Sequence, residues 1–427
     1  MTNGDMIGTR LLAGSAHNAK KAVLFASFWR QQSHVGNNRV DRFLRWLAES
    51  GYYVILIRAG SKNAERTETW GTEITVRDPL GLYRDPAPGA TQVSPRKPSP
   101  LRRSLALRLF VPDPGILWAR AAAKNETVIG AVRGASFILS SSPPESVHLG
   151  AWLLSRRTGV PHIVDMRDGW MDEPNNPLLA TSPLRRWREA SMEARIIRDA
   201  RAIQVTSNVW KQLLSARYEG ISHKVHVLTN AYPANAFDAA TPDSEGVGER
   251  LLIHAGNFLA SRSTQSPDLL LGPLLENLSL KPSCGVVQLI GSLSNEDMAI
   301  IQSFQPRFEG IGWRIQNAAP IARSKVLARL ATADGLLLLA ATHAALPSKV
   351  FEYIPTGKPL FVVTYKGSAT WQLCEPLPQA TLFEIGAERT GDSMDGRSPF
   401  YEKRPHVVPS EYSEESLARV FAQAITL

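Results

Sequence analysis

The sequence predicts an α/β protein made of two parallel-sheet domains in series. Short runs rich in Val, Ile and Leu alternate with longer segments of helical period, and this alternation is typical of βαβ units. The chain has 427 residues, which is long for one compact core and suits two domains of roughly 150–200 residues each. We therefore expect two α/β domains that face each other across a cleft.

The N-terminal domain is predicted to span residues 1–235. Apolar runs predict its strands at Ala22–Phe28, Tyr52–Arg58, Ser136–Ser140, His162–Asp165, Ala202–Thr206 and Val225–Thr229. The helix after the first strand has Asn38 as its expected N-cap. Its apolar face comprises Val40, Phe43, Leu44 and Leu47. A later helix begins at Ser182, with Pro183 at its first position. The side chains expected to point inward from it are Leu184, Trp187, Ala190, Ala194 and Ile197.

A Pro-, Ala- and Gly-containing linker at 236–250 precedes the C-terminal domain, predicted at 251–405. Its expected strands are Leu251–His254, Val286–Ile290, Trp313–Gln316, Gly335–Leu339 and Leu360–Thr364. Its expected helices are Pro267–Leu278, Ser324–Ala333 and Lys349–Pro355. The last segment, 406–427, contains a helix that begins at the capping residue Ser413. We expect this helix to pack at the domain junction.

Composition and charge limit the function classes. No apolar run reaches half of the ~20 residues that a membrane-spanning helix needs, and the N-terminus lacks a secretion signal, so a cytoplasmic protein is expected. The net charge of +9 makes nucleic acid, a membrane surface or a phosphorylated ligand candidate partners. The stretch 96–108 holds five cations and no acid, which suits peripheral binding to anionic lipid on the inner face of the membrane. A solvated basic loop is the alternative.

Several strong motifs are absent. No Walker phosphate loop and no Gly-x-Gly-x-x-Gly after a predicted strand are present, which disfavours Walker-type ATPases and nicotinamide-dependent dehydrogenases. His223 and His226 lack Cys or carboxylate partners, and no Asp-x-Asp pair occurs, so no metal site is predicted. Nucleic acid is not an expected partner, because no aromatic residues interleave the basic stretch.

The segment 345–363 is the most informative in the chain. The predicted strand Gly335–Leu339 leads into a loop, and the loop enters a short helix near Ser348. Backbone N–H groups at such a helix start, together with Lys349, would bind a phosphate at the carboxyl edge of the sheet. Glu352, one turn later, would accept ribose hydroxyls. The alternative is a Lys–Glu surface pair on an ordinary helix.

This segment resembles the donor-binding motif of family 4-like glycosyltransferases with the GT-B fold of two facing Rossmann domains. The matching residues are Leu346-Pro-Ser-Lys-Val-Phe-Glu-Tyr353 followed by Gly357-Lys-Pro359. Further blocks resemble the same family in their expected order. They are Phe25–Arg30 with His34–Asn38, Phe110–Trp118, Ser140–Pro144, Val164–Trp170, Thr229–Tyr232 and His254–Asn257.

The resemblance implies sugar transfer from a nucleotide-sugar donor, with retention, without an obligatory metal and with no cofactor beyond the donor itself. It implies that donor binding involves Gly256, Asn257, Arg262, Ser348, Lys349 and Glu352. The family commonly has a second glutamate eight positions before Glu352, where this chain has Ala344. In the family that glutamate normally contacts the transferred sugar. Its replacement by alanine therefore bears on which donor is used and on whether the protein is active.

Polar residues of the N-terminal domain would orient the acceptor hydroxyl. The catalytic candidates are His34, Asp165 and Asp168, and the acceptor-side candidates are Gly36, Asn37, Asn38 and Ser141. Each has a structural alternative. His34 would stabilise its loop, the two aspartates would brace a turn through an Asp–Arg pair, and Ser141 would help to cap the next helix.

The sequence therefore predicts a GT-B glycosyltransferase that moves a hexose or related sugar to a glycan or lipid-linked acceptor, as in polysaccharide biosynthesis. Two other classes stay open. A nucleotide-sugar epimerase would share the architecture and release a free sugar epimer. A catalytically silent sugar-nucleotide-binding protein would bind donor without turnover, as Ala344 allows.

Overall fold

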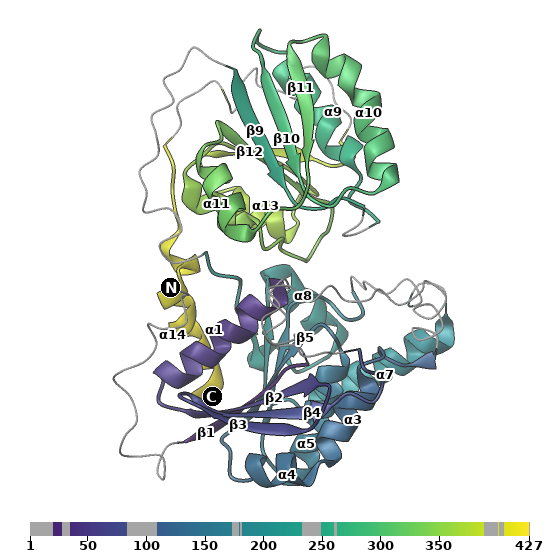
Figure 1. The fold of residues 1–427 in the computed structure, drawn as a ribbon, viewed down its shortest axis with the longest axis vertical. Coiled ribbons are helices and arrows are strands. Elements are labelled where there is room, and N and C mark those ends of the chain that lie inside the picture. Colours follow the sequence, from purple (N-terminus) through teal and green to yellow (C-terminus); the bar gives the residue numbers. More distant parts are fainter. Residues whose placement is uncertain are drawn as a thin grey trace. The chain divides into compact units, whose positions relative to one another are not determined.

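The computed structural model describes residues 20–27, 35–82, 109–172, 179, 182–232, 249–259, 263–387, 400 and 405–426, with the backbone alone at 35–38. The chain divides into two compact units, each built around its own sheet (Figure 1). Unit 1 comprises Met1–Thr206, Lys211–Leu228 and Val420–Leu427, and unit 2 comprises Ser207–Trp210 and Thr229–Arg419. Among the described residues, no helix is both long enough and apolar enough to cross a bilayer.

Unit 1 contains a sheet in which the described strands lie in the order β3-β4-β2-β1-β5-β6-β7-β8. All neighbours pair in parallel except β3, which runs antiparallel to β4. The strands are β1 (Lys21–Phe25), β2 (Tyr53–Gly60), β3 (Ala64–Glu68), β4 (Gly71–Arg77), β5 (Ile138–Ser142), β6 (His162–Met166), β7 (Ala202–Val205) and β8 (Val225–Val227).

The helices of this half of the chain connect the strands as crossovers. They are α1 (Val35–Glu49), α3 (Ile116–Lys124), α4 (Glu126–Val132), α5 (Ser146–Thr158), α7 (Pro183–Asp199) and α8 (Asn208–Arg217). Side chains of α3, α4 and α5 share one apolar core with β1 and β2. At its centre the Phe25 and Trp118 rings lie 5.1 Å apart. The predicted inward face of α1 is confirmed, because its four apolar side chains are buried.

Unit 2 contains a parallel sheet with strand order β11-β10-β9-β12-β13-β14. The strands are β9 (Arg250–Ala255), β10 (Gly285–Ile290), β11 (Trp313–Ala318), β12 (Gly335–Ala340), β13 (Leu360–Thr364) and β14 (Ala380–Glu384). The helices are α9 (Pro267–Leu278), α10 (Asn295–Glu309), α11 (Arg323–Ala331), α12 (Val350–Tyr353) and α13 (Ala369–Cys374). Alternate side chains of β12 enter two cores: α9 and α10 share one, and α11, α12 and α13 share the other. The predicted α/β class with two parallel-strand sheets is confirmed.

Several details of the prediction need correction. Strands β3, β4 and β14 were not predicted, and β3 in particular reads AERTE and exposes most of its side chains at the sheet edge. The predicted helix at Lys349–Pro355 is shorter, since α12 ends at Tyr353 and a 3-10 turn covers Ile354–Thr356. The predicted inward face of α7 is wrong at two positions: Leu184 is 58% and Trp187 66% exposed.

The buried face of α7 is instead partly ionic. Arg185 and Glu189, one turn apart, are both buried and form an ion pair of 2.6 Å. The Glu189 carboxylate also accepts a hydrogen bond of 2.8 Å from the indole N–H of Trp170. A buried charge is tolerated when it is paired and hydrogen-bonded, so this network lets charged residues face the core. The helix is therefore rotated from the orientation that its apolar residues predict.

The C-terminal helix α14 (Glu414–Thr426) ends within unit 1. The Ser413 hydroxyl accepts a hydrogen bond of 3.2 Å from the backbone N–H of Ser416, which confirms the predicted cap. Phe421 is fully buried, and its ring lies 5.0 Å from that of Phe43 and 5.5 Å from that of Trp46, both on α1. Aromatic packing thus attaches the end of the chain to the first helix.

Replacement of the anchoring ring tests this attachment. Phe421→Ala is expected to lower the free energy of unfolding of unit 1 by about 3–5 kcal/mol, because it removes a fully buried aromatic ring. Urea denaturation monitored by the fluorescence of the wild type and variant would measure the change. Gln423→Ala, on the exposed side of the same helix, is the matched control and should change stability by less than about 0.5 kcal/mol. Equal effects of the two substitutions would contradict the packing role of Phe421.

Candidate functional site

Strand β9 of unit 2 ends in a glycine loop that α12 holds in place. The Tyr353 hydroxyl accepts a hydrogen bond of 2.8 Å from the backbone N–H of Ala255 and donates one of 3.4 Å to the carbonyl of the same residue. Tyr353 is fully buried, so this pair of bonds is shielded from water. The bonds fix the carboxyl end of β9 against the segment that the sequence singled out.

The next residue, Gly256, leaves room for the Lys349 ammonium. Its backbone has φ +147°, and a Cβ built on it would overlap Nζ of Lys349. The following Asn257 accepts a hydrogen bond of 2.8 Å at Oδ1 from the backbone N–H of Ser292. Only glycine therefore allows the ammonium to approach the backbone of this loop. The structure brings together three of the predicted donor-binding residues, Gly256, Asn257 and Lys349, from segments more than 90 residues apart.

Lys349 is a half-buried cation without a direct partner in the described part of the chain. Burial lowers the pKa of Lys349 to about 8, while the charge of Glu352 opposes that shift. The Glu352 carboxylate itself binds the Arg323 guanidinium, with Nε and a terminal nitrogen both 2.7 Å from the same oxygen. The ammonium is therefore held beside the loop and is available to an anion. Arg323 was not predicted, because nothing in its local sequence marks it.

Of the other predicted donor-binding residues, the structure describes one and leaves the other outside its described ranges. Ser348 is exposed and precedes α12, whereas Arg262 lies outside the described residues. Helix α12 has only four residues. Its macrodipole is correspondingly small. The helix therefore contributes little to the binding of an anion at its start. Ala344, at the position of the family's first glutamate, is fully buried.

In unit 1, Asp165 is part of a buried ion pair. Its carboxylate accepts hydrogen bonds from Arg39, at 2.9 Å from Nε and 2.6 Å from a terminal nitrogen, and from the Ser141 hydroxyl at 2.6 Å. Arg39 also donates to the Leu228 carbonyl at 2.9 Å. Asp165 and Ser141 are thus brought together as predicted residues. The partner of Asp165 is Arg39 on α1, however, so the pair links two distant elements and differs from the turn-bracing Asp–Arg pair expected as the alternative.

Asp168 lies beyond the end of β6 and is only partly buried. Its neighbour Arg167 donates to the Pro143 carbonyl at 3.0 Å. Burial raises the pKa of the nearby Glu145 to about 8, and the charges of Asp113 and Asp168 add to the shift. Glu145 follows β5 and was not predicted, because a single acid after Pro-Pro carries no motif. The carboxyl ends of β5 and β6 therefore gather two carboxyl groups and a guanidinium.

The other predicted residues of unit 1 cannot be placed in this way. His34 and the basic stretch 96–108 lie outside the described residues. Gly36, Asn37 and Asn38 form part of the first turns of α1, where only the backbone is described. Since α1 begins at Val35, Asn38 is inside the helix and is not its N-cap. Among the described residues, no three His, Cys, Asp or Glu side chains form a group that would hold a metal ion.

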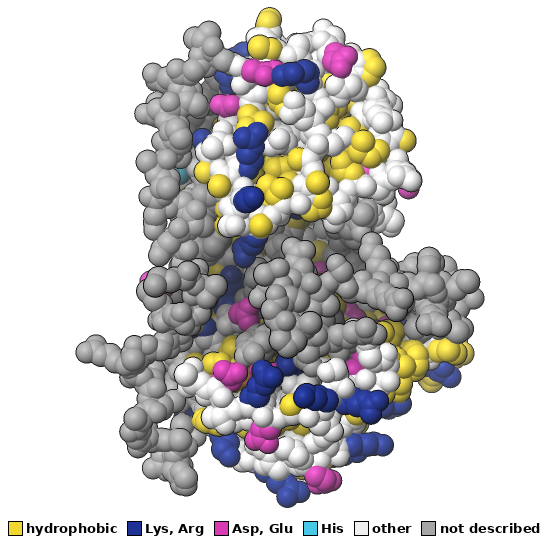
Figure 2. All heavy atoms as spheres, in the orientation of Figure 1, with side chains coloured by type: hydrophobic (Ala, Val, Ile, Leu, Met, Phe, Trp, Pro, Cys, Tyr) yellow, Lys and Arg dark blue, Asp and Glu magenta, His cyan; other side chains and the backbone are white. Residues whose placement is uncertain are grey.

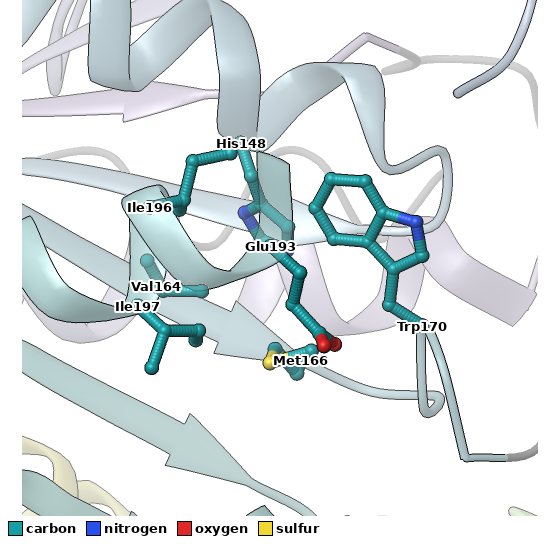
Figure 3. Close-up of a pocket in the computed structure, with 7 residues that line it drawn as sticks. All are labelled: His148, Val164, Met166, Trp170, Glu193, Ile196 and Ile197. Carbon is teal, nitrogen blue, oxygen red and sulfur yellow. The ribbon is translucent and has the colours of Figure 1, made fainter. Parts of the chain in front are cut away.

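Lys and Arg side chains are dispersed across the face of unit 1 drawn in Figure 2. A small pocket lies inside the same unit, among mostly apolar side chains (Figure 3). His148 and Glu193 are its polar lining residues. The Ser140 hydroxyl forms hydrogen bonds of 2.7 Å with Nδ1 of His148 and with Nε2 of His162. Burial lowers the pKa of both histidines to about 3. Ser140, His148 and His162 therefore form a buried structural cluster, separate from the residues at the strand ends.

Neutralisation of Asp165 tests its structural role. Asp165→Asn would leave the Arg39 guanidinium buried without its counter-charge, so the free energy of unfolding should fall by about 3–5 kcal/mol. Asp199→Asn removes a surface carboxylate 3.9 Å from Arg156 and should cost less than about 1 kcal/mol. Chemical denaturation of both variants would measure the difference. Wild-type stability of Asp165→Asn, with loss of activity alone, would favour the catalytic interpretation.

The buried histidines predict acid sensitivity. Their pKa of about 3 in the folded chain lies below the ordinary histidine pKa of 6.5, so the unfolded chain binds more protons between these values. Stability should therefore fall as the pH drops below 6.5, by about 1.4 kcal/mol per pH unit for each histidine. His148→Gln should remove one histidine's share of the slope between pH 6 and pH 5, measured by urea denaturation. His223→Gln, at an exposed position, is the control; equal slopes in all three proteins would contradict the assignment.

Comparison with known proteins bears on both units. Residues 36–231 match the model of the "Glycosyl transferase 4-like domain" family. No curated protein sequence matches the chain.

Solved structures of similar fold cover nearly the whole chain. Sucrose-phosphate synthase from Thermosynechococcus elongatus is 13% identical with a TM-score of 0.55, over 95% of this chain and 94% of that one. Anabaena HepE in complex with UDP and glucose is 12% identical with a TM-score of 0.56, over 95% and 99%. Starch synthase IV from Arabidopsis thaliana, bound to ADP and acarbose, is 9% identical with a TM-score of 0.54, over 96% of each chain. The chain therefore has the GT-B fold of two Rossmann-like domains, and its residues 36–231 are similar to the glycosyl transferase 4-like domain.

Proposed function

We propose that this protein is a glycosyltransferase that uses a nucleotide-sugar donor, and that Lys349 binds the donor diphosphate beside Gly256. The observation that supports this most directly is the half-buried ammonium held over a glycine backbone at the carboxyl end of β9. Ligands of open α/β sheets bind at this edge. HepE and starch synthase IV, which share the fold, have been solved with UDP and with ADP.

The chemistry follows from the charge of the leaving group. As the bond between the sugar C1 and the diphosphate oxygen breaks, the electron pair goes to that oxygen, and the positive charge of Lys349 stabilises it. The acceptor hydroxyl bonds to C1, and its proton passes to the departing diphosphate oxygen. We infer a retaining reaction without a metal, in which the protein supplies the cations itself. Arg262 is proposed as the second of these, with Asn257 and Ser348 as polar contacts to the phosphates.

Glu352 is proposed to bind the ribose. Arg323 holds one of its oxygens at 2.7 Å and fixes the direction of the carboxylate. The second oxygen is then oriented to accept hydrogen bonds from ribose hydroxyls. A carboxylate fixed in this way loses less side-chain entropy on binding than a free one.

On the acceptor side we propose Asp168 and His34 as the residues that orient the attacking hydroxyl, near Gly36, Asn37 and Asn38. The acceptor is proposed to be a glycan or a lipid-linked sugar, and a hexose or related sugar is proposed as the transferred group. Binding of anionic lipid by the stretch 96–108 would bring the enzyme to a lipid-linked acceptor at the inner face of the membrane.

Ala344 favours a second candidate function. The position where the family commonly has a sugar-binding glutamate holds a buried methyl group. A chain without that carboxylate would bind the nucleotide and transfer no sugar. Incubation with a panel of nucleotide sugars and mixed glycan or lipid-linked acceptors separates the candidates. Release of free nucleoside diphosphate that depends on acceptor supports the transferase, whereas binding without release supports the silent protein.

Calorimetric titration with UDP, GDP, ADP and TDP, without metal, tests the donor site. We expect one diphosphate to bind the wild type at micromolar Kd. Lys349→Ala should weaken that binding about 10- to 100-fold, because a hydrogen bond to a charged group is lost. Glu352→Ala should weaken it less, since ribose contacts are neutral.

Lys358→Ala is the control, because this lysine lies beyond α12 in the same segment and is equally half-buried. It should bind like the wild type. Absence of binding by any of the four diphosphates would reject the donor site, and equal losses in Lys349→Ala and Lys358→Ala would reject the role of Lys349.

A further inference from the structure

His254, the penultimate residue of β9, has a buried nitrogen without a partner in the described part of the chain. The residue is 1% exposed, and its Nε2 makes no hydrogen bond. An unsatisfied polar atom in the core costs about 1–3 kcal/mol. Such a residue directly after the apolar run Leu251–Ile253 therefore needs an explanation.

The environment fixes both the tautomer and the orientation of the ring. Nδ1 lies 3.0 Å from the Leu337 carbonyl, which can only accept, so Nδ1 carries the proton. In the neutral imidazole, Nε2 is then an acceptor with a free lone pair. The Phe258 ring stacks on the imidazole at 4.5 Å and prevents its rotation. The lone pair consequently has one fixed direction.

That nitrogen lies beside the loop that accommodates Lys349. A Cβ built on Gly256 would lie 3.8 Å from Nε2 of His254 and would overlap Nζ of Lys349. The acceptor and the three-donor ammonium thus both lie close to the space that a side chain at position 256 would occupy. The ammonium is carried on a flexible four-carbon stem, so rotation about the bonds of that stem can turn it towards the lone pair.

Electrostatics support a neutral imidazole at this place. Burial lowers the pKa of His254 well below its usual range, and the charge of Lys349 lowers it further. Glu352 is the other charged group that acts on the ammonium, and its carboxylate is paired with Arg323. A neutral histidine accepts from an ammonium without charge repulsion.

We propose that His254 is a positioning residue for Lys349: Nε2 accepts one hydrogen bond from the ammonium and directs the remaining N–H groups to a bound diphosphate. This inference rests on the proposed donor site for the identity of the anion. The pairing of His254 with Lys349 concerns the free protein, so it is testable whether or not a nucleotide binds.

The first test measures the apparent pKa of Lys349 by competitive acetylation across pH and mass spectrometry, without nucleotide. His254→Phe keeps an aromatic ring against Phe258 but has no acceptor. Loss of a hydrogen bond to a charged group should lower the pKa of Lys349 by about one unit. His254→Gln places an amide oxygen near the position of Nε2 and should restore most of the shift. Lys358, measured in the same samples, should not change. An unchanged pKa of Lys349 in His254→Phe would overturn the proposal.

A second measurement leaves His254 intact, in case its variants fold poorly. In protein labelled with ¹⁵N-histidine, the Nε2 resonance of His254 should move towards that of a free acceptor in Lys349→Ala and stay in place in Lys358→Ala. Identical spectra of the two variants would overturn the proposal.

Diphosphate titration of the same variants then gives the functional consequence. We expect His254→Phe to weaken binding about 10-fold in the wild-type background and to have no further effect in Lys349→Ala. An additional loss in the Lys349→Ala background would show that His254 acts without Lys349, which contradicts the positioning role. If the wild type binds no diphosphate, the proposed donor site fails, while the pKa and ¹⁵N results still decide whether His254 holds Lys349.

Discussion

The arrangement of the candidate site depends on one steric constraint, the missing side chain at Gly256. Any Cβ at this position would displace the Lys349 ammonium. Tyr353 adds a second restraint, because its hydroxyl binds both polar groups of the Ala255 backbone and keeps α12 at the end of β9. Lys349 is the residue that immediately precedes α12, so these bonds also set the position of its Cα. A buried tyrosine and an absent methyl group together define where the cation lies.

Much of the fold follows from local sequence. Helix α9 begins and ends where predicted, at Pro267 and Leu278, because a proline at the first position and a continuous apolar pattern mark its limits. Parallel strands buried on both faces, such as Gly335–Ala340, appear as uninterrupted apolar runs. The elements that local pattern could not predict are those that depend on distant partners. The edge strand β3 has a polar sequence, and the orientation of α7 depends on a buried network in which Trp170, outside the helix, donates a hydrogen bond to Glu189.

The same distinction applies to the site. The motif around Lys349 was recognisable because its residues are contiguous, and so were Gly256 and Asn257 in their own block. Arg323 lies in no motif, and His254, although it begins the same block as Gly256, had no predicted role. The roles of both come from Glu352 and Lys349, which lie 29 and 95 positions away. Asp165 shows the opposite case. Its position after a buried strand suggested reactivity, but Arg39, 126 residues earlier, occupies its carboxylate.

In this chain, whether a buried charge has a partner therefore distinguishes a structural group from a functional one. Asp165 and Arg39 satisfy each other with several hydrogen bonds, so neither can bind a ligand without breaking a buried ion pair. The Lys349 ammonium occupies the space that a side chain at Gly256 would fill. No carboxylate in the described residues contacts it directly. Its partial burial raises the free energy of the unpaired cation, and burial accordingly depresses its pKa to about 8. An anion that binds there removes this cost, so part of the affinity for a diphosphate is already stored in the free protein as incomplete solvation of the ammonium.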